Sequence, residues 1–476
     1  MRGRVVAGVG AALVVAAAGG LLVGAGLDGG GPERPAVSAS TPAALPSPAA
    51  PVLAPAAGGA GPGGPSAAGV SGALRTALSD PALGRSLGAT VLAADGTVLL
   101  DRGGAAHTPA SVAKLLTGAA AITALGPDTT LVTRVVTAPA AQGTPDASAA
   151  PAGPVDLVLV GGGDATLQSA GYGRGDDTTA YARLDVLADR VAAALGEGAA
   201  IRLRVDDTLF DAPAVSPDWE PGYVPGGIAA PVSALSVDQG RVRPGEDARV
   251  EDPALEAGRR FAALLQAAGV QVVEGVGRGG APAGAGELAS VASPPVSRLV
   301  ERMLEESDND LAEGLARLVA AERGHPATAA GGGAAVLAAA GEAGVPVEGA
   351  LLLDGSGLAR GSRLPSATVA GALRAAASPG HPELRPVLTG LPVAGLTGTL
   401  AERYAPDGAL DAARGQVRAK TGTLTGVSSL AGVVRGRDGA LLVFAFLADR
   451  VPGSTLDARQ ALDEAATALA RCGCGS

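Results

Sequence analysis

Lysine and asparagine are almost absent from this chain of 476 residues. Lysine and arginine together number 36, but only Lys114 and Lys420 are lysines, so the other 34 are arginines. Asn309 is the only asparagine. Because the chain otherwise uses arginine and aspartate, each of these three exceptions indicates a role that arginine or aspartate cannot fill.

Cysteine is nearly absent too, with only Cys472 and Cys474 in the terminal RCGCGS. Two cysteines are too few for a disulfide framework, and no histidine lies near them to complete a metal site. The sequence therefore predicts no metal and favours a mobile tail at residues 471–476. An intermolecular disulfide is the alternative.

Aromatic residues make up 2% of the chain although hydrophobic residues reach 47%. A core must therefore be built from Ala, Val and Leu, which is globular rather than disordered composition. The net charge is −10, and neither acidic nor basic residues form a long run. The missing basic face argues against a protein that binds nucleic acid.

The first 27 residues have the composition of a signal peptide or a membrane anchor. Arg2 and Arg4 precede an uncharged run of 23 residues, Val5–Leu27, which would span about 34 Å as a helix and could cross a bilayer. Small residues at Val23-Gly24-Ala25 offer a cleavage site for a secretory signal. With either outcome, a secreted protein or one held by a single membrane tether, the rest of the chain is exported.

Composition divides the remaining chain into five segments. Residues 28–70 are rich in Pro, Ala, Gly and Ser and form an extended linker. Residues 71–127 and 291–470 hold most of the helical pattern and form the two parts of one domain. Residues 128–290 alternate strand-like segments with loops and are an inserted, β-rich region. Residues 471–476 are the tail.

Local patterns predict the elements within these segments. The first part has a short helix at ALRTAL, a hairpin around Asp95-Gly96 and a helix whose first turn contains Ser111 and Lys114. The insertion alternates strands (LVTRVV, DLVLV, IRLRV, VQVVEGV) with loops and one helix, ARLDVLADRVAAAL. The second part has two helical stretches separated near Ser307, then three strands and a final helix that begins after Ser454.

Ser111 and Lys114 form a Ser-x-x-Lys pair. Residues three apart lie on the same face of a helix, so the hydroxyl and the amine can meet. Lysine with a lowered pKa can take the proton of a serine nucleophile, whereas arginine cannot. Taken alone the pair is weak evidence, because most such pairs are an exposed serine and a solvated lysine.

Two further motifs contain the other rare residues. Ser307-Asp308-Asn309 lies between helical stretches and could present a hydroxyl and a carboxamide to a cleft, although a helix cap is the simpler explanation. Lys420, Thr421, Gly422 and Thr423 lie on a predicted strand, and suit a carboxylate-bearing extended ligand that adds to the strand edge.

The order Ser-x-x-Lys, Ser-Asp-Asn, Lys-Thr-Gly is that of the penicillin-interacting serine acyltransferases. With these motifs the chain resembles the D-alanyl-D-alanine carboxypeptidases and endopeptidases of the low-molecular-mass class C penicillin-binding proteins. Five further stretches look like that family: VGGGDATL (160–167), VDDTLF (205–210), PVSALSVDQG (231–240), LDGSGLAR (353–360) and LPVAGLTGTL (391–400). Only 196 positions separate Ser307 from Ser111, so the insertion is short for the family.

The resemblance implies an α+β fold of the transpeptidase/β-lactamase-like kind, with an antiparallel sheet flanked by helices. It implies that Ser111 attacks the last peptide bond of a peptidoglycan stem peptide with Lys114 as the base. Ser307 would relay a proton and Asn309 would orient Lys114. Lys420 and Thr423 would bind the terminal carboxylate, and the backbone N–H groups of Ser111 and Thr423 would stabilise the oxyanion.

The same resemblance implies no cofactor and no metal, and makes β-lactam antibiotics inhibitors. Two alternatives remain open. A serine β-lactamase shares the three motifs, but the only asparagine is already used in Ser-Asp-Asn, so the usual deacylating element of the class A enzymes is absent. A catalytically silent wall-binding or β-lactam-sensing protein would keep the same pocket.

Overall fold

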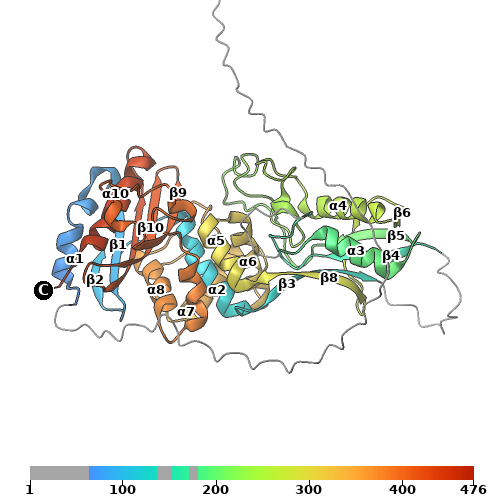
Figure 1. Ribbon diagram of the computed structural model, residues 1–476, viewed down its shortest axis with the longest axis horizontal. Coiled ribbons are helices and arrows are strands. Elements are labelled where there is room, and N and C mark those ends of the chain that lie inside the picture. The colour runs from blue at the N-terminus through green and yellow to red at the C-terminus, as the bar shows by residue number, and fades with distance from the viewer. Residues whose placement is uncertain (1–63, 138–152, 171–180, 476) are drawn as a thin grey trace, which may run out of the picture. The chain divides into compact units, whose positions relative to one another are not determined.

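The computed structural model describes residues 64–137, 153–170 and 181–475, drawn in colour in Figure 1. The predicted signal peptide or anchor, residues 1–27, and most of the predicted linker lie outside the described residues. Within the described ranges, no helix is both long and apolar enough to cross a membrane.

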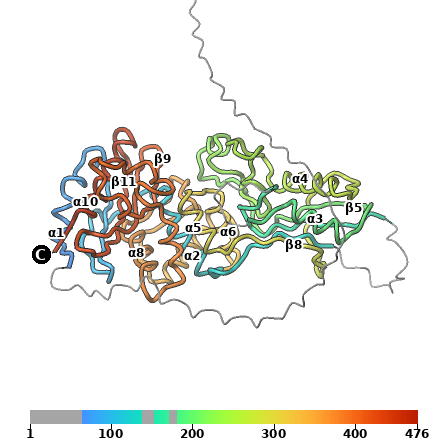
Figure 2. The backbone as a smooth tube through the Cα atoms, viewed as in Figure 1, coloured from blue at the N-terminus to red at the C-terminus, as the bar shows by residue number. Residues whose placement is uncertain are grey.

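An antiparallel sheet of five strands joins the two ends of the chain, in the order β2-β1-β11-β10-β9. Strand β1 from the N-terminal part pairs with β11 from the C-terminal part along eight residues, so that blue and red segments run side by side in Figure 2. The strands are β1 (Ser86–Ala93), β2 (Val98–Arg102), β9 (Val417–Leu424), β10 (Val427–Arg435) and β11 (Leu441–Asp449).

Helices cover both faces of this sheet, as predicted, because its strands are apolar on both sides. On β11, Phe444 and Phe446 pack toward α1 (Ala67–Leu74) and α10 (Thr455–Arg471). The side chains that alternate with these two along β11 face the larger helical layer. That layer consists of α2 (Lys114–Leu125), α5 (Val296–Glu306), α6 (Asn309–Glu322), α7 (Ala329–Glu342), α8 (Ser366–Ala377) and α9 (Arg385–Thr389).

A second sheet lies in the inserted region and has its own apolar core, in the order β6-β5-β4-β3-β8, with β7 also paired to β5. Helices α3 (Leu184–Leu195) and α4 (Pro253–Ala267) pack in that core. The strands are β3 (Thr130–Thr137), β4 (Val155–Val160), β5 (Ala200–Asp206), β6 (Gln271–Val272), β7 (Gly277–Arg278) and β8 (Gly286–Pro295). The strand predicted at VQVVEGV is thus only two residues long there.

Short 3₁₀ turns connect these elements, and one of them changes a local prediction. Ser111 lies on the turn η3 (Ala110–Ala113), and α2 begins only at Lys114, so the prediction that one α-helical turn holds both residues was wrong. The other turns are η1 (Ala77–Ser79), η2 (Pro81–Leu83), η4 (Asp238–Gly240), η5 (Pro382–Leu384), η6 (Gly398–Leu400) and η7 (Asp411–Ala413).

The C-terminal tail is packed rather than mobile, which corrects the sequence-based prediction. Cys472 and Cys474 are bonded to each other, not to another chain. Cys474 is 5% exposed, and its carbonyl accepts a hydrogen bond of 2.6 Å from Ser66 N. Ser66 also caps α1, which begins at Ala67, inside the segment predicted to be linker.

Candidate active site

The turn η3 presents Ser111 at the start of α2 in a constrained backbone. Ala110, immediately before it, has a φ of 49°, in the left-handed region that non-glycine residues seldom adopt. Gly357 packs so closely that a Cβ atom there would lie 2.0 Å from the Ala110 carbonyl oxygen. Ser429 Oγ on β10 donates to the Pro109 carbonyl at 2.9 Å. The turn that carries Ser111 is therefore held from two sides.

Lys114 is fully buried and bonds to three oxygen atoms. Its Nζ lies 3.0 Å from Ser111 Oγ, 2.7 Å from Asn309 Oδ1 and 2.9 Å from the Ser356 carbonyl oxygen. The last two oxygens can only accept hydrogen bonds, whereas the serine hydroxyl can also donate. When the amine is neutral, its lone pair can therefore face only the hydroxyl of Ser111.

Burial lowers the pKa of Lys114 to about 8. Four carboxyl groups nearby, Asp354 and Glu313 foremost, act in the opposite direction and keep the pKa from falling further. A pKa near 8 leaves a useful fraction of neutral amine close to neutral pH, which a general base requires. Arginine in the same place would remain charged.

Strand β9 runs against the turn that carries Ser111 at Gly422. A Cβ atom at this position would lie 2.9 Å from the Pro109 carbonyl oxygen and 3.1 Å from Ser111 N. Only glycine allows this approach without displacing the backbone. The approach brings the Lys-Thr-Gly strand beside the backbone N–H of Ser111.

The other residues of this strand divide between its two sides. Lys420 is fully buried, and its Nζ donates to the Thr421 carbonyl at 3.0 Å. Burial lowers its pKa well below the usual value, and the charge of Lys114 lowers it further. Thr421 Oγ1 lies 2.9 Å from Thr399 Oγ1, and Thr423 is exposed. β9 is an edge strand, so Thr423 borders open sheet edge.

The Ser-Asp-Asn motif forms the turn between α5 and α6. Ser307 ends α5 in the left-handed conformation (φ 59°), and Asp308 caps α6 by accepting from Leu311 N at 3.0 Å. The simpler explanation, a helix cap, is therefore correct for Asp308, while Asn309 bonds to Lys114. Among the described residues no hydrogen bond joins Ser307 to Ser111 or Lys114.

Three residues near Lys114 have no role assigned from the sequence: Glu313, Asp354 and Ser356. Glu313 is fully buried and accepts from Ser356 N at 2.8 Å, and Asp354 accepts from Trp219 Nε1 at 2.9 Å. Burial, and then the charge of Asp354, raises the pKa of Glu313 to about 8. Glu313 thus holds the Ser356 segment in place, and its charge, like that of Asp354, favours the protonated form of Lys114.

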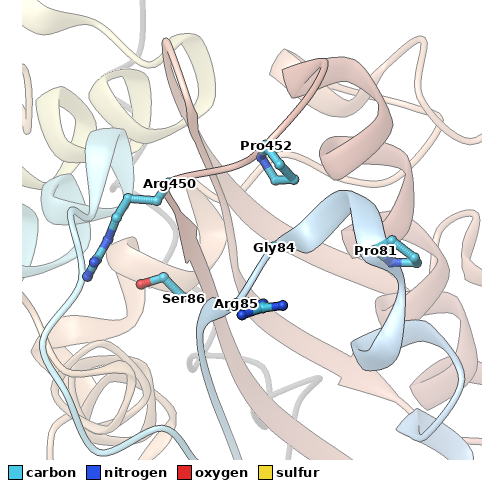
Figure 3. A pocket seen from close by; sticks show the side chains of 6 residues that line it. All are labelled: Pro81, Gly84, Arg85, Ser86, Arg450 and Pro452. Atoms are coloured by element: carbon cyan, nitrogen blue, oxygen red, sulfur yellow. The ribbon is translucent and has the colours of Figure 1, made fainter.

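A separate cavity lies on the same sheet, at β1 and β11. It has a volume of about 570 Å³ and is lined by Pro81, Gly84, Arg85, Ser86, Arg450 and Pro452. In Figure 3 Ser86 lies between the side chains of Arg450 and Arg85. The hydroxyl of Ser86 donates to Asp449 and lies 3.3 Å from His107 Nδ1. The lining of this cavity contains no lysine, so it does not repeat the Ser-x-x-Lys pair of Ser111 and Lys114.

The model of the D-Ala-D-Ala carboxypeptidase 3 (S13) family matches residues 70–249 and 245–470. The chain belongs to this family. The match confirms the resemblance to the low-molecular-mass class C penicillin-binding proteins.

Individual relatives agree along most of their length. Carboxypeptidase DacB of Mycolicibacterium smegmatis is 38% identical over 418 residues, which cover 87% of this chain and 86% of that protein. The D-alanyl-D-alanine carboxypeptidase of an Actinomadura species (strain R39) is 32% identical and covers 76% of this chain and 78% of its own length.

Among solved structures, penicillin binding protein 4 of Haemophilus influenzae matches with a TM-score of 0.64 at 20% identity. The alignment covers 84% of this chain and 97% of that one. At this identity the likeness concerns the fold alone, and it confirms the predicted fold of an antiparallel sheet flanked by helices with an insertion.

Proposed function

We propose that this chain is a serine-type D-Ala-D-Ala carboxypeptidase that cleaves the last peptide bond of peptidoglycan stem peptides through an acyl-enzyme on Ser111. The observation that carries the proposal is the arrangement around Lys114 Nζ, whose three partners include one group able to donate a proton, the Ser111 hydroxyl. The family to which the chain belongs supports the substrate class.

In the first step neutral Lys114 takes the proton of Ser111, and Oγ attacks the carbonyl carbon between the two terminal D-alanines. The backbone N–H groups of Ser111 and Thr423 stabilise the oxyanion, since Gly422 lets their strand and turn approach. The C–N bond then breaks, and Ser307 relays a proton to the leaving amine of D-alanine. Water later attacks the ester, which frees Ser111 and releases the shortened peptide.

Substrate binding also prepares the base. Lys420 and Thr423 bind the terminal carboxylate, with Thr421 and Gly422 shaping the strand between them. The negative charge of that carboxylate favours the protonated form of Lys420, and a charged Lys420 in turn favours the neutral form of Lys114. The substrate therefore helps to place the single positive charge where it binds rather than where the base is needed.

A β-lactam antibiotic carries a similar carboxylate and a reactive amide, so it should acylate Ser111 and inhibit the enzyme. One solved structure that shares this fold is penicillin binding protein 4 of Haemophilus influenzae in complex with a β-lactam. We place the protein outside the cytoplasmic membrane, where its substrate is, and assign export to residues 1–27, whether cleaved or kept as an anchor.

Mass spectrometry after exposure of the exported part to benzylpenicillin tests the proposal. We expect one adduct on the Ser111 peptide, none in Ser111→Ala, and turnover of a diacetylated tripeptide that ends in D-Ala-D-Ala. Lys114→Arg should acylate about 10²–10⁴-fold more slowly with an unchanged fold, because arginine keeps the charge but cannot be the base.

The other outcomes separate the alternatives. Rapid loss of the drug with no stable adduct would indicate a β-lactamase. Neither adduct nor drug loss would indicate a silent wall-binding or β-lactam-sensing protein. Normal acylation of Lys114→Arg would remove the role assigned to Lys114. Release of a peptide from crosslinked stems, compared with release of D-alanine, measures the endopeptidase share.

A further inference from the structure

Three consecutive side chains at the start of α6 are bonded to one loop of the inserted region, residues 227–250. Each bond is short; that of Asp310 is buried, that of Asp308 is partly buried and that of Asn309 is exposed. Gln239 Nε2 donates to Asp308 Oδ2 at 2.6 Å, Asn309 Nδ2 donates to the Ile228 carbonyl at 2.8 Å, and Ala230 N donates to Asp310 Oδ1 at 2.7 Å. The insertion therefore contacts the Ser-Asp-Asn motif directly, one side chain after another.

Arg249 ties this loop to α6 with a single guanidinium group. Its side chain is 3% exposed, and Nη2 lies 3.0 Å from Asp310 Oδ2. The same group donates to the carbonyl oxygens of Gln239 and Gly227. Gly227 precedes Ile228, so Arg249 fixes both parts of the loop that bond to the motif. The planar fork of arginine suits such a three-way contact, which lysine could not reproduce.

The loop adopts a backbone that only outside support can maintain. Asp238, Gln239 and Gly240 have φ values of 50°, 57° and 63°, three left-handed residues in a row of which only one is glycine. Asp238 is held by Arg260 Nη1 at 2.8 Å and by Ser169 N at 2.9 Å, both from the insertion. An unfavourable backbone conformation of this kind persists only where the surrounding structure holds it in place.

What the loop controls is the orientation of the Asn309 amide. Because Nδ2 donates to the Ile228 carbonyl, Oδ1 must face Lys114 and can only accept from it. The opposite orientation would point an N–H group at Lys114 and compete with Ser111 for the lone pair of the neutral amine. An Asn309 that is free to rotate would therefore weaken the general base.

We propose that Gln239 and Arg249 are positioning residues for the reaction: they hold the loop that fixes the Asn309 amide, and through it the direction in which Lys114 accepts the proton of Ser111. The inserted region is thus a part of the active site as well as a separate sheet. This inference rests on the proposed function, because it assumes that Ser111 is acylated with Lys114 as the base.

The test separates binding of benzylpenicillin from the acylation step in stopped-flow and quenched-flow experiments. For Gln239→Ala we expect the acylation rate constant to fall about tenfold, and for Arg249→Met up to about 10²-fold, as small misplacements of catalytic groups do. The dissociation constant of the initial complex should stay within about twofold, because Lys420 and Thr423 are untouched. The fraction of chains finally acylated should also stay the same, whereas misfolding would lower it.

A double-mutant cycle shows whether Gln239 acts through Asn309. In an Asn309→Ala background, Gln239→Ala should cause no further loss of rate. Arg243→Met is the matched control, since the side chain of Arg243 lies in the same loop, is 78% exposed and, within the described part of the chain, pairs only with Glu246. It should acylate at the wild-type rate.

Two results would overturn the inference while leaving the proposed function intact: wild-type acylation rates in both Gln239→Ala and Arg249→Met, or an undiminished effect of Gln239→Ala without Asn309. If wild-type protein forms no adduct on Ser111 at all, the proposed function fails first, and the inference falls with it.

Discussion

At the scale of single residues, the reaction proposed for Ser111 depends on how readily the buried ammonium group of Lys114 loses its proton. Burial makes the charged form of Lys114 unfavourable, and this effect exceeds the opposite effect of the surrounding carboxylates. Asp354 and Glu313 contribute most to that opposition. The site thus surrounds a buried amine of lowered pKa with several acidic groups.

The lowered pKa of Lys114 gives a definite pH dependence. Below pH 8 the amine is mostly protonated, so the second-order rate constant of acylation by benzylpenicillin should rise about tenfold per pH unit and level off above pH 8. Rates measured from pH 6 to pH 9 on the wild type, with thermal unfolding at each pH as the control, check this. A rate independent of pH across this range would mean that Lys114 is not the base in the free enzyme.

The Gly422→Ala variant tests how closely β9 must approach the turn that carries Ser111. In Gly422→Ala the added Cβ atom meets the Pro109 carbonyl and Ser111 N, so backbone must move. We expect a loss of roughly 1–3 kcal/mol in the free energy of unfolding and at least a tenfold slower acylation. Gly453→Ala is the control, since a Cβ atom there has open space. Equal rates for the two variants would show that the approach at Gly422 has no effect on catalysis.

At the scale of elements, local pattern predicted those parts that local interactions determine. The hairpin at Asp95-Gly96, the C-terminal strands and the Ser454 cap of α10 are all present. The 3₁₀ turn at Ser111 was missed, because it depends on packing against Gly357 and Gly422 from distant segments. β8 (Gly286–Pro295) was missed too, because Ala, Ser and Pro have low strand propensity and only pairing with β3 makes it a strand.

The same distinction applies to the candidate site. The rare residues Lys114, Asn309 and Lys420 could be found from the sequence because composition made them stand out. The Ser356 carbonyl could not be found in this way, since every residue has a carbonyl and Ser356 lies 242 positions after Lys114. Glu313 was within reach, because it lies one turn after Asn309 on the same helix face.

Asp308 separates a capping role from a catalytic one at the level of the helix. Asp308→Ala removes the cap of α6 and the partner of Gln239. Ser454→Ala removes the equivalent cap of α10, far from the site in sequence. Each should lower the free energy of unfolding by about 1 kcal/mol, but only Asp308→Ala should slow acylation. Chemical denaturation and acylation kinetics measure the two effects. Unchanged acylation in Asp308→Ala would assign this residue to stability alone.

At the scale of the whole molecule, segments from opposite ends of the chain build the sheet that supports the site. β1 pairs with β11, and α1 contacts α10. The sequence predicted that both ends of the chain contribute to one domain and one sheet, and the pairing of β1 with β11 agrees with this. It did not predict which strands or helices meet, because nothing in β1 specifies a partner more than three hundred residues away. The packed C-terminal tail belongs to the same class, and this is why two cysteines in a glycine-rich end looked mobile.

The tail should stabilise the sheet without affecting the chemistry. A chain that ends at Arg471 loses the bond from Ser66 N to the Cys474 carbonyl, the bond from Arg437 N to the Cys472 carbonyl and the burial of Cys474. We expect its free energy of unfolding to fall by on the order of 1–2 kcal/mol, which lowers the melting temperature by a few degrees. The acylation rate should be unchanged.

Cys474→Ser distinguishes packing of the tail from the disulfide. It keeps both backbone bonds, breaks the link to Cys472 and puts a hydroxyl in place of the buried sulfur. Because the two cysteines are only two positions apart, the link constrains the unfolded chain little. The melting temperature should therefore change less than in the truncated chain. A loss as large as that of truncation would show that the disulfide stabilises this end. A slower acylation in either variant would mean that the junction of α1, α10 and the tail reaches the active site through the sheet.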